Sequence, residues 1–296
     1  MSITSAMYTG VSGLIGNGES ISVIGNNIAN VNTTGFKYGR TLFSDMLSAN
    51  IGNNSQVGRG MQIQQVQNIF SQGSFENTEN ITDLAIQGNS FFALKDPNTA
   101  APVPTQNAAF LSRAGAFHVD NTLNLVNPDG YQVLDTQGNP IRFLNDANPA
   151  NNATNFGKVL KVEPNGLITY LAMDGVSTLY YNTSGAVGVP SDPANAATVQ
   201  RVALVTPVDA SGLEKAGNSL YRATGNSGVP AAAFSLASNS ANGTSEKVLS
   251  NSLEMSNVDL ATQFVKLITT QRAYSANSKT ITTADEMTQE VLNLKR

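Results

Sequence analysis

The sequence contains no cysteine and has few charged residues. The absence of cysteine among 296 residues excludes disulfide scaffolds, thiolate metal sites and cysteine nucleophiles. Charged residues make up 13% of the chain, against roughly 25% in an average soluble protein. The solvated surface must therefore consist largely of Asn, Ser, Thr, Gln and Gly, a composition that suits contact with copies of itself. The net charge is −4 and basic runs are absent, so neither nucleic acid nor a polybasic membrane patch is expected.

The N-terminus has no basic residue before Lys37, and no unbroken apolar run resembles a secretory signal or a membrane span. If the protein works outside the cytoplasm, we expect it to leave by a route that reads no cleaved signal. The length allows one large domain or two to three smaller ones.

Candidates for catalysis or metal binding are few. His118 is the only histidine, and without cysteine or a carboxylate cluster nearby it is a poor metal ligand, so a surface position is favoured. Acidic residues beside Gly or Asn are typical of turns, although a glycosidase-like pair from distant strands stays open as a minor alternative. We expect no enzyme activity, no metal site and no cofactor. The scattered acidic residues are Asp83, Asp120, Asp129, Asp135, Glu163 and Asp174.

Apolar residues near the N-terminus recur at spacings of three, four and seven, which predicts a helix from residue 2 to about 34. Each of its five glycines costs about 1 kcal/mol relative to Ala, but each also lets a neighbouring backbone approach closely. Because a narrow apolar stripe cannot stabilise a solitary helix, this one needs a partner, within the monomer or in an assembly. This N-terminal stripe consists of Ile3, Met7, Leu14, Ile21, Ile24, Ile28 and Val31.

A second apolar stripe lies near the C-terminus and predicts a closing helix. Asn257 or Asp259 is suited to cap its start. The register then shifts for Met287, Val291 and Leu294, so the pattern is not continuous. The C-terminal stripe consists of Leu260, Phe264, Leu267, Tyr274 and Ile281.

The middle of the chain has the pattern of β structure. From residue 71 to about 245, short apolar stretches alternate with turn signals, as in an antiparallel sandwich or barrel. Residues 35–70 are expected to form an extended connector, with a helical turn within residues 42–47 and a strand from Met61. Residues 145–200 are low in apolar content at both ends and suggest a small insertion. The predicted fold class is α+β, with terminal helices enclosing a mostly antiparallel β body.

The chain resembles bacterial flagellar axial proteins, the family of rod and hook proteins. The resemblance covers both ends and much of the middle. Its motifs are SGL (residues 12–14), IGNNIANVNTTGFK (24–37), FSQGSFENTENITDLAIQGNSFFAL (70–94), RAGAFHVD (113–120), LNLVNPDGYQVL (123–134), GLEKAGNSLYRATGNSG (212–228) and the closing run from SNSLEMSN (250–257) to VLNLKR.

This resemblance implies a coiled-coil axial domain of residues 1–34 with 253–296, lining a narrow export channel, and one or more β-rich outer domains within residues 71–252. It also implies export in an unfolded state by the flagellar type III apparatus. The implied partners are copies of the chain in a helical polymer and, at its ends, the rod, the hook cap and the hook–filament junction. Neither nucleic acid nor membrane insertion is implied.

Within the family, two features favour a compact hook protein. Residues 40–60 lack the longer insertion of distal rod proteins, and the C-terminal run resembles hook proteins more closely. The first hypothesis is therefore a subunit of the extracellular hook, a curved tube that encloses the export channel and transmits torque from rod to filament as a universal joint. A distal or proximal rod protein is the alternative within the family, and a β-rich secreted enzyme or adhesin is the alternative outside it.

The resemblance also assigns roles to residues. Both apolar stripes are expected to pack between subunits. In the N-terminal motif, Asn side chains are expected to satisfy backbone groups where the helix ends, and Gly35 to permit a turn that Phe36 anchors. The matching motif positions are Asn26, Asn27, Asn30, Gly35, Phe36 and Lys37.

Overall fold

The computed structural model describes residues 3–52, 55–144, 153–182, 186–189 and 199–294, and divides into two compact units. Unit 1 combines residues 1–31, 37–69 and 258–296, and unit 2 combines residues 32–36 and 70–257. The chain therefore crosses between the units four times, at residues 31–32, 36–37, 69–70 and 257–258. The predicted α+β class is confirmed, with helices at both ends of the chain and antiparallel strands between them.

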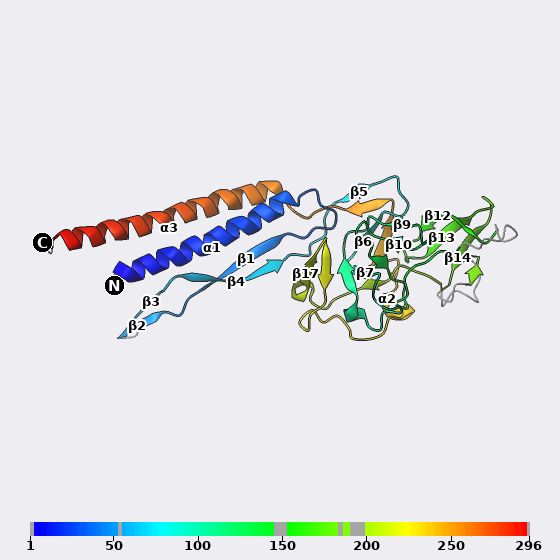
Figure 1. Ribbon diagram of the computed structural model, residues 1–296, viewed down its shortest axis with the longest axis horizontal. Helices are drawn as coiled ribbons and strands as arrows, with labels where there is room; N and C mark the ends of the chain where they lie inside the picture. The colour runs from blue at the N-terminus through cyan, green and yellow to red at the C-terminus, as the bar shows by residue number, and fades with distance from the viewer. Residues whose placement is uncertain (1–2, 53–54, 145–152, 183–185, 190–198, 295–296) are drawn as a thin grey trace. The chain divides into compact units, whose positions relative to one another are not determined.

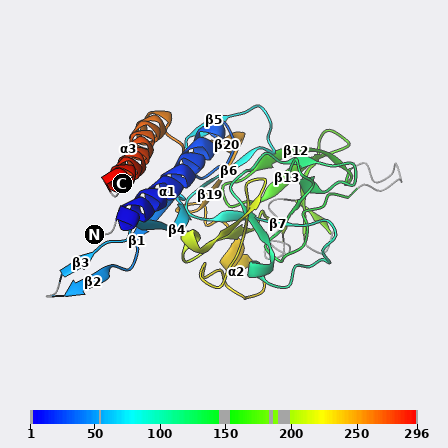
Figure 2. The same ribbon diagram turned by 60° about the vertical axis from the view of Figure 1, so that its left-hand side comes forward.

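Unit 1 is built on two antiparallel helices, α1 (Ile3–Ala29) and α3 (Leu260–Leu294). A hairpin of β1 (Gly39–Asp45) and β4 (Met61–Asn68) packs on α1 and continues into the shorter pair β2 (Ala49–Gly52) and β3 (Ser55–Val57). α1 consequently lies between α3 and the hairpin (Figures 1 and 2). Asp259 caps α3, since its carboxylate accepts a 3.1 Å hydrogen bond from the Ala261 backbone N–H.

The hairpin corrects one prediction for residues 35–70. The helical turn expected within residues 42–47 is wrong, because β1 pairs with β4 from Gly39, opposite Asn68, to Asp45, opposite Met61. The Ser20 hydroxyl of α1 also lies 2.9 Å from the Thr41 hydroxyl of β1. Pairing and packing of this kind outweigh a local preference for helix. Residues 37–69 of the expected extended connector belong to the same unit as the helices, and the strand predicted from Met61 is confirmed.

Unit 2 contains a central antiparallel sheet in the order β17-β18-β8-β7-β11-β10-β9, in which β16 also pairs with β7. Two further pairs, β6 with β19 and β5 with β20, bring the C-terminal part of the unit back to residues 75–87. The elements so far unnamed are β5 (Phe75–Asn77), β6 (Leu84–Gln87), β7 (Phe91–Lys95), η1 (Gln106–Ala108), β8 (Phe110–Ser112), β9 (His118–Val119), β10 (Leu125–Val126), β11 (Gln132–Val133), β16 (Leu204–Val205), η3 (Ala210–Gly212), β17 (Glu214–Gly217), β18 (Leu220–Arg222), α2 (Leu236–Asn239), β19 (Lys247–Ser250) and β20 (Ser252–Glu254).

β7 organises the core of unit 2 because both of its faces are buried. Successive side chains of a strand point to opposite sides. Phe92 and Leu94 accordingly enter one apolar cluster, while Phe91 and Ala93 enter another, and all four side chains are inaccessible to solvent. The continuous apolar run at residues 91–94 is what a strand covered on both faces requires.

A separate four-stranded sheet falls within residues 145–200, where the sequence suggested an insertion. It consists of β12 (Phe156–Val162), β13 (Ile168–Ala172), β14 (Thr178–Tyr181) and β15 (Val187–Gly188). Ile168 and Tyr170 of β13 lie in the same buried cluster as Phe92 of the central sheet. The two sheets therefore share a core. Residues 145–152, 183–185 and 190–198 of the suggested insertion lie outside the described residues.

Turns between these strands follow the predicted chemistry. Asn165 accepts a 2.9 Å hydrogen bond from the Leu167 backbone N–H, and Gly166 adopts a φ of +83° that favours glycine. The carboxylates of Asp120 and Asp174 likewise accept hydrogen bonds from backbone N–H groups two residues further on. The interpretation of these acidic residues as turn formers is confirmed.

Candidate functional site on the terminal helices

The face of α3 that packs on α1 is made mostly of small and polar residues. Gly10 and Gly13 of α1 approach this face so closely that a Cβ on Gly13 would lie 2.5 Å from Nδ2 of Asn277, and one on Gly10 would lie 2.8 Å from Cγ1 of Ile281. The predicted role of the glycines in close approach is thereby confirmed at these two positions. The buried and half-buried residues of α3 are Gln263, Leu267, Thr270, Ala273, Asn277, Ile281, Ala284 and Thr288.

α3 leaves most of its large apolar side chains exposed. Phe264 is 49% exposed and Ile268 is 51% exposed. Exposed apolar surface of this extent is typical of sites that contact another molecule. The exposed apolar residues of α3 are Leu260, Phe264, Val265, Ile268, Tyr274, Met287, Val291, Leu292 and Leu294.

The two predicted stripes therefore meet only in part. On α1, every described side chain of the N-terminal stripe is buried or half-buried, namely Met7, Leu14, Ile21, Ile24, Ile28 and, just beyond the helix, Val31. The side chain of Ile3 lies outside the described part of the structure. On α3, Leu267 and Ile281 are half-buried, whereas Leu260, Phe264 and Tyr274 are exposed. The C-terminal stripe is thus only partly covered by α1, and Gln263 and Asn277 take positions on the α1 side.

Asn27 joins three segments of unit 1. Its side-chain amide donates a 2.8 Å hydrogen bond to the Gly39 carbonyl and a 3.2 Å hydrogen bond to Oε1 of Gln263. Its Oδ1 accepts a 2.9 Å hydrogen bond from the Gly39 N–H. Asn27 is buried, so these bonds satisfy polar groups that water cannot reach. The motif asparagines were expected to satisfy backbone groups, and Asn27 binds both backbone groups of Gly39.

Asn30 satisfies the end of α1 in a second way. Its side-chain amide donates a 2.9 Å hydrogen bond to the carbonyl oxygen of Asn26, which also accepts a 3.2 Å hydrogen bond from the Asn30 backbone N–H. The helix ends at Ala29, a few residues before the turn at Asn32 to Gly35.

Gly35 and Phe36 form the predicted turn within unit 2. Gly35 has a φ of +66°, and its N–H donates a 2.7 Å hydrogen bond to the Glu254 carbonyl. A Cβ at Gly35 would lie 2.4 Å from the Ala114 nitrogen, so only glycine fits. Phe36 is buried, and the Lys215 ammonium lies 4.7 Å from the centre of its ring. Lys37, the last residue of the motif, is fully buried in unit 1.

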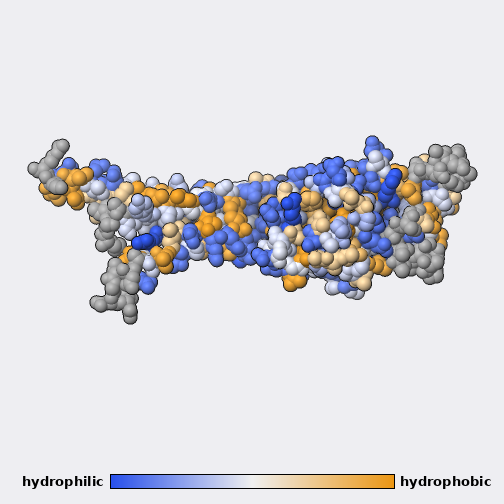
Figure 3. Space-filling view, turned by 60° about the horizontal axis from the view of Figure 1, so that its bottom comes forward, coloured by the Kyte–Doolittle hydropathy of each residue, from blue (hydrophilic) through white to orange (hydrophobic). Residues whose placement is uncertain are grey.

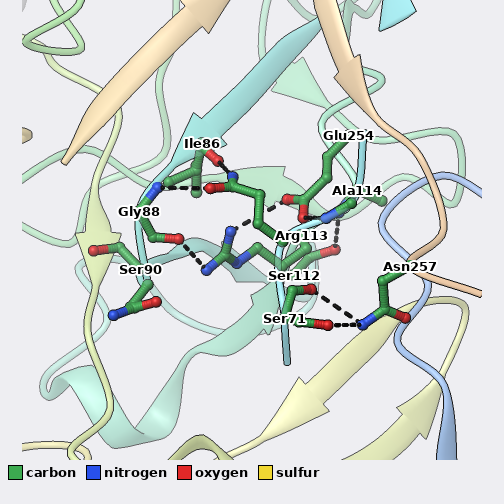
Figure 4. Close-up of polar contacts among 12 residues, drawn as sticks. Ser71, Ile86, Gly88, Ser90, Ser112, Arg113, Ala114, Glu254 and Asn257 are labelled. Carbon is green, nitrogen blue, oxygen red and sulfur yellow. Dashed lines mark hydrogen bonds and ion pairs between the residues drawn. The ribbon is translucent and has the colours of Figure 1, made fainter. Parts of the chain in front are cut away.

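A buried ion pair in unit 2 was not predicted from the sequence. Nη1 of Arg113 lies 3.2 Å from Oε2 of Glu254, and both side chains are almost completely inaccessible. Nη2 of Arg113 donates a 2.7 Å hydrogen bond to the Gly88 carbonyl, while Oε1 of Glu254 accepts one of 2.9 Å from the Gly73 N–H (Figure 4). Burial lowers the pKa of Arg113, and the neighbouring Glu254 carboxylate opposes that shift.

Hydrogen bonds from Asn257 join three segments of unit 2. Asn257 donates its side-chain amide to the Ser71 carbonyl over 3.1 Å (Figure 4), and its backbone N–H to the Phe36 carbonyl. Arg113 and Glu254 are 141 residues apart, so no local spacing in the sequence could have predicted that they pair. The available signal was the Arg that begins RAGAFHVD and the one charged residue of SNSLEMSN, Glu254, in a chain with few charges.

His118 is exposed on β9, as expected. Among the described residues, no three His, Asp or Glu side chains are grouped so that they could hold a metal ion. None of the described helices combines the length and the apolar character needed to cross a bilayer.

Three protein-family models match the chain. The "Flagella basal body rod protein" model matches residues 7–37, the "Flagellar hook protein FlgE/F/G D1 domain" model matches residues 85–170, and the "Flagellar basal body rod FlgEFG protein C-terminal" model matches residues 249–294. The first and third fall on the terminal helices and the segments next to them, and the second falls on the β body.

Individual relatives divide by how much of the chain they match. The flagellar basal-body rod protein FlgG of Bacillus subtilis is 36% identical over 303 residues, which cover 98% of this chain and 99% of that protein. FlgG of Borreliella burgdorferi is 29% identical over 98% of both chains. The flagellar hook protein FlgE of Borreliella burgdorferi is 39% identical, but over only 46% of this chain and 33% of the hook protein.

Proposed function

We propose that this chain, which belongs to the family of flagellar basal-body rod and hook proteins, is a subunit of the rod. It is a structural protein of the flagellar axis and not an enzyme. The sequence motifs favour the hook over the rod, whereas the full-length relatives support the rod.

The observation that carries the choice is the end-to-end match to rod proteins. Alignment with the Bacillus subtilis rod protein extends over 98% of the chain and 99% of the rod protein, so neither has a large unmatched part. We give this full-length match more weight than the shortness of residues 40–60, which favoured the hook. The hook protein matches, by contrast, leave about two thirds of the hook protein unmatched.

The geometry of unit 1 supports assembly with other copies. α3 leaves large apolar residues exposed along most of its length and covers only its small and polar side with α1. Copies of the chain provide the same kind of surface many times over, so burying these side chains between subunits yields roughly 25 cal/mol per Å² of apolar area. We assign Leu260, Phe264 and Tyr274 of the C-terminal stripe to contacts between copies. The partly covered N-terminal stripe, with Leu267 and Ile281, contributes to the pairing within each copy.

The same proposal names the remaining partners. Other axial proteins would adjoin the polymer at its two ends, and the flagellar export apparatus would deliver the chain in an unfolded state. The glycine-weakened α1 fits such a route, because it is a poor helix until it packs against α3 and the hairpin.

Electron microscopy of the polymerised chain tests the proposal. We expect a straight tube, because a rod subunit builds a straight shaft. A curved tube would restore the hook hypothesis, and a chain that stays monomeric at high concentration would contradict both. Deletion of residues 1–31 is the matched variant, and it should abolish the polymer while the near-ultraviolet circular dichroism of unit 2 persists.

A further inference from the structure

A groove of about 550 Å³ lies on unit 1 between α1 and the hairpin. Its α1 wall is apolar and open to solvent, with Tyr8 74% exposed and Ile15 60% exposed. Arg59 is the one charged residue that lines it, and no carboxylate among the described residues pairs with this guanidinium. The lining residues are Ser5, Tyr8, Val11, Ser12, Ile15, Met46 and Arg59.

A second unpartnered surface lies at the end of α3, which has 35 residues against 27 in α1. Gly10 faces Ile281, so with an equal rise along the two antiparallel helices Ile3 is level with about residue 288. The turns of α3 after that point extend beyond the described part of α1, as Figure 1 shows. Apolar side chains gather at this end of α3 in Figure 3, among them Met287, Val291 and Leu294.

We propose that the groove of one copy receives the C-terminal turns of α3 from a second copy. This inference rests on the proposed assembly function and names the surfaces that meet. Both surfaces are apolar, and Arg59 of the groove has acidic counterparts near the end of α3. Glu286 and Glu290 are exposed, and they flank Met287 and Val291 in sequence on the helix that would approach Arg59. Opposite charges across such a contact fix its register and disfavour wrong pairings.

The two surfaces lie at different places on the same chain, and this determines the kind of polymer. A contact between unlike patches is heterologous. A copy whose helix end is bound still has an empty groove, and a copy whose groove is filled still has a free helix end, so either can bind a further copy. Such a contact extends without limit unless the rotation closes a ring. A like-with-like contact would instead stop at a dimer.

Cysteine cross-linking tests the pairing directly because the natural chain has no cysteine. Ser5→Cys places a thiol in the groove at small cost in volume, and Val291→Cys places one on the end of α3. Oxidation of polymers that carry both substitutions should yield a ladder of dimers, trimers and longer chains on denaturing gels. Each single variant should give at most dimers, and Ser5→Cys with Val176→Cys, an exposed position in unit 2, should give no ladder.

The outcomes separate this inference from the proposed function. If the doubly substituted chain polymerises but gives no ladder, or only a cross-link within one copy, the pairing of groove and helix end is wrong while the rod proposal stands. If the unmodified chain forms no polymer, both are contradicted.

A charge exchange supplies a second test that does not depend on thiol geometry. Arg59→Glu should raise the concentration needed for polymerisation about tenfold, which corresponds to about 1.4 kcal/mol. Adding Glu286→Lys and Glu290→Lys should return this concentration to that of the unmodified chain. If the triple variant still needs the higher concentration to polymerise while circular dichroism shows intact helices, the proposed pairing is wrong.

Discussion

The two units solve the problem of apolar burial in opposite ways. In unit 2, β7 buries Phe91, Phe92 and Leu94 completely by using both faces of the strand. In unit 1, α3 covers Gln263 and Asn277 against α1 while Phe264 and Ile268 remain in solvent. Unit 2 therefore closes its own core, whereas unit 1 leaves apolar area that only another molecule can cover. We therefore expect the β body to be stable on its own and the helices to provide the contacts for assembly.

The largest effect is expected from breaking the buried ion pair in unit 2. Arg113→Met should cost about 3–5 kcal/mol in the free energy of unfolding of unit 2, because it leaves the Glu254 carboxylate buried without its cation. Denaturant unfolding followed by tyrosine fluorescence measures this cost. Lys161→Met, in the exposed pair with Glu163, is the matched control and should change stability by less than about 1 kcal/mol. Equal effects would show that the burial of Arg113 is not what matters.

A smaller effect, confined to unit 1, is expected from Asn27→Ala. The substitution leaves the Gly39 N–H and carbonyl without their buried partner, at roughly 1–3 kcal/mol for each unsatisfied group. Thermal loss of helical circular dichroism in the polymer should therefore shift to lower temperature, while the unfolding of unit 2 stays unchanged. Ser22→Ala, at an exposed position of the same helix, is the control. A matching loss in unit 2 would break the division between the units.

The stability of unit 2 should also depend on pH through Asp135. Burial raises the pKa of this carboxyl to about 6, because its Oδ2 has no hydrogen-bond partner and the charged form is penalised. The folded state therefore holds a proton that the unfolded state releases near pH 4. Asp135 therefore stabilises unit 2 fully below that pH. As the pH rises through about 6, this stabilisation is lost, and the free energy of unfolding falls by up to about 3 kcal/mol.

Asp135→Asn should flatten this dependence, as measured by denaturant midpoints from pH 4 to pH 8. Asp174 is the natural contrast, because hydrogen bonds from Ser177 lower its pKa. Asp174 should therefore stabilise unit 2 at neutral pH and lose this effect as the pH falls. Asp174→Asn should remove only this small decrease in stability at acidic pH. An unchanged slope in the Asp135→Asn variant would contradict the assignment.

The smallest effect concerns the close approach of the helices. Gly13→Ala should destabilise the α1–α3 pair by about 1–2 kcal/mol, because the new methyl group forces Asn277 to move. Gly25→Ala is the control, since nothing lies within 4 Å of a Cβ there, and it should stabilise the helix by up to about 1 kcal/mol. Thermal melting of the polymer compares the two variants. Stabilisation by both would show that the approach at Gly13 is not required.

Periodicity and turn residues predicted much of this architecture, because both are local properties. The heptad spacings predicted the two helices, and signals such as Asn165-Gly166 predicted the β body. The hairpin at residues 39–68 was missed, since its strands are held by pairing between β1 and β4 and by packing on α1. The Arg113–Glu254 pair was missed for the same reason, because its partners are distant in sequence. The side of α3 that faces α1 also could not be predicted, since apolar spacing alone favoured Phe264 over Gln263 for that position.

Amide hydrogen exchange of the monomer and of the polymer tests most directly whether the helices are completed by neighbouring copies. In the monomer, we expect fast exchange along α1 and α3 and strong protection of β7 in unit 2. In the polymer, the helices should gain protection of at least about a hundredfold, equivalent to about 2.7 kcal/mol. Helices that are as protected in the monomer as in the polymer would contradict the account, because unit 1 would then be complete on its own.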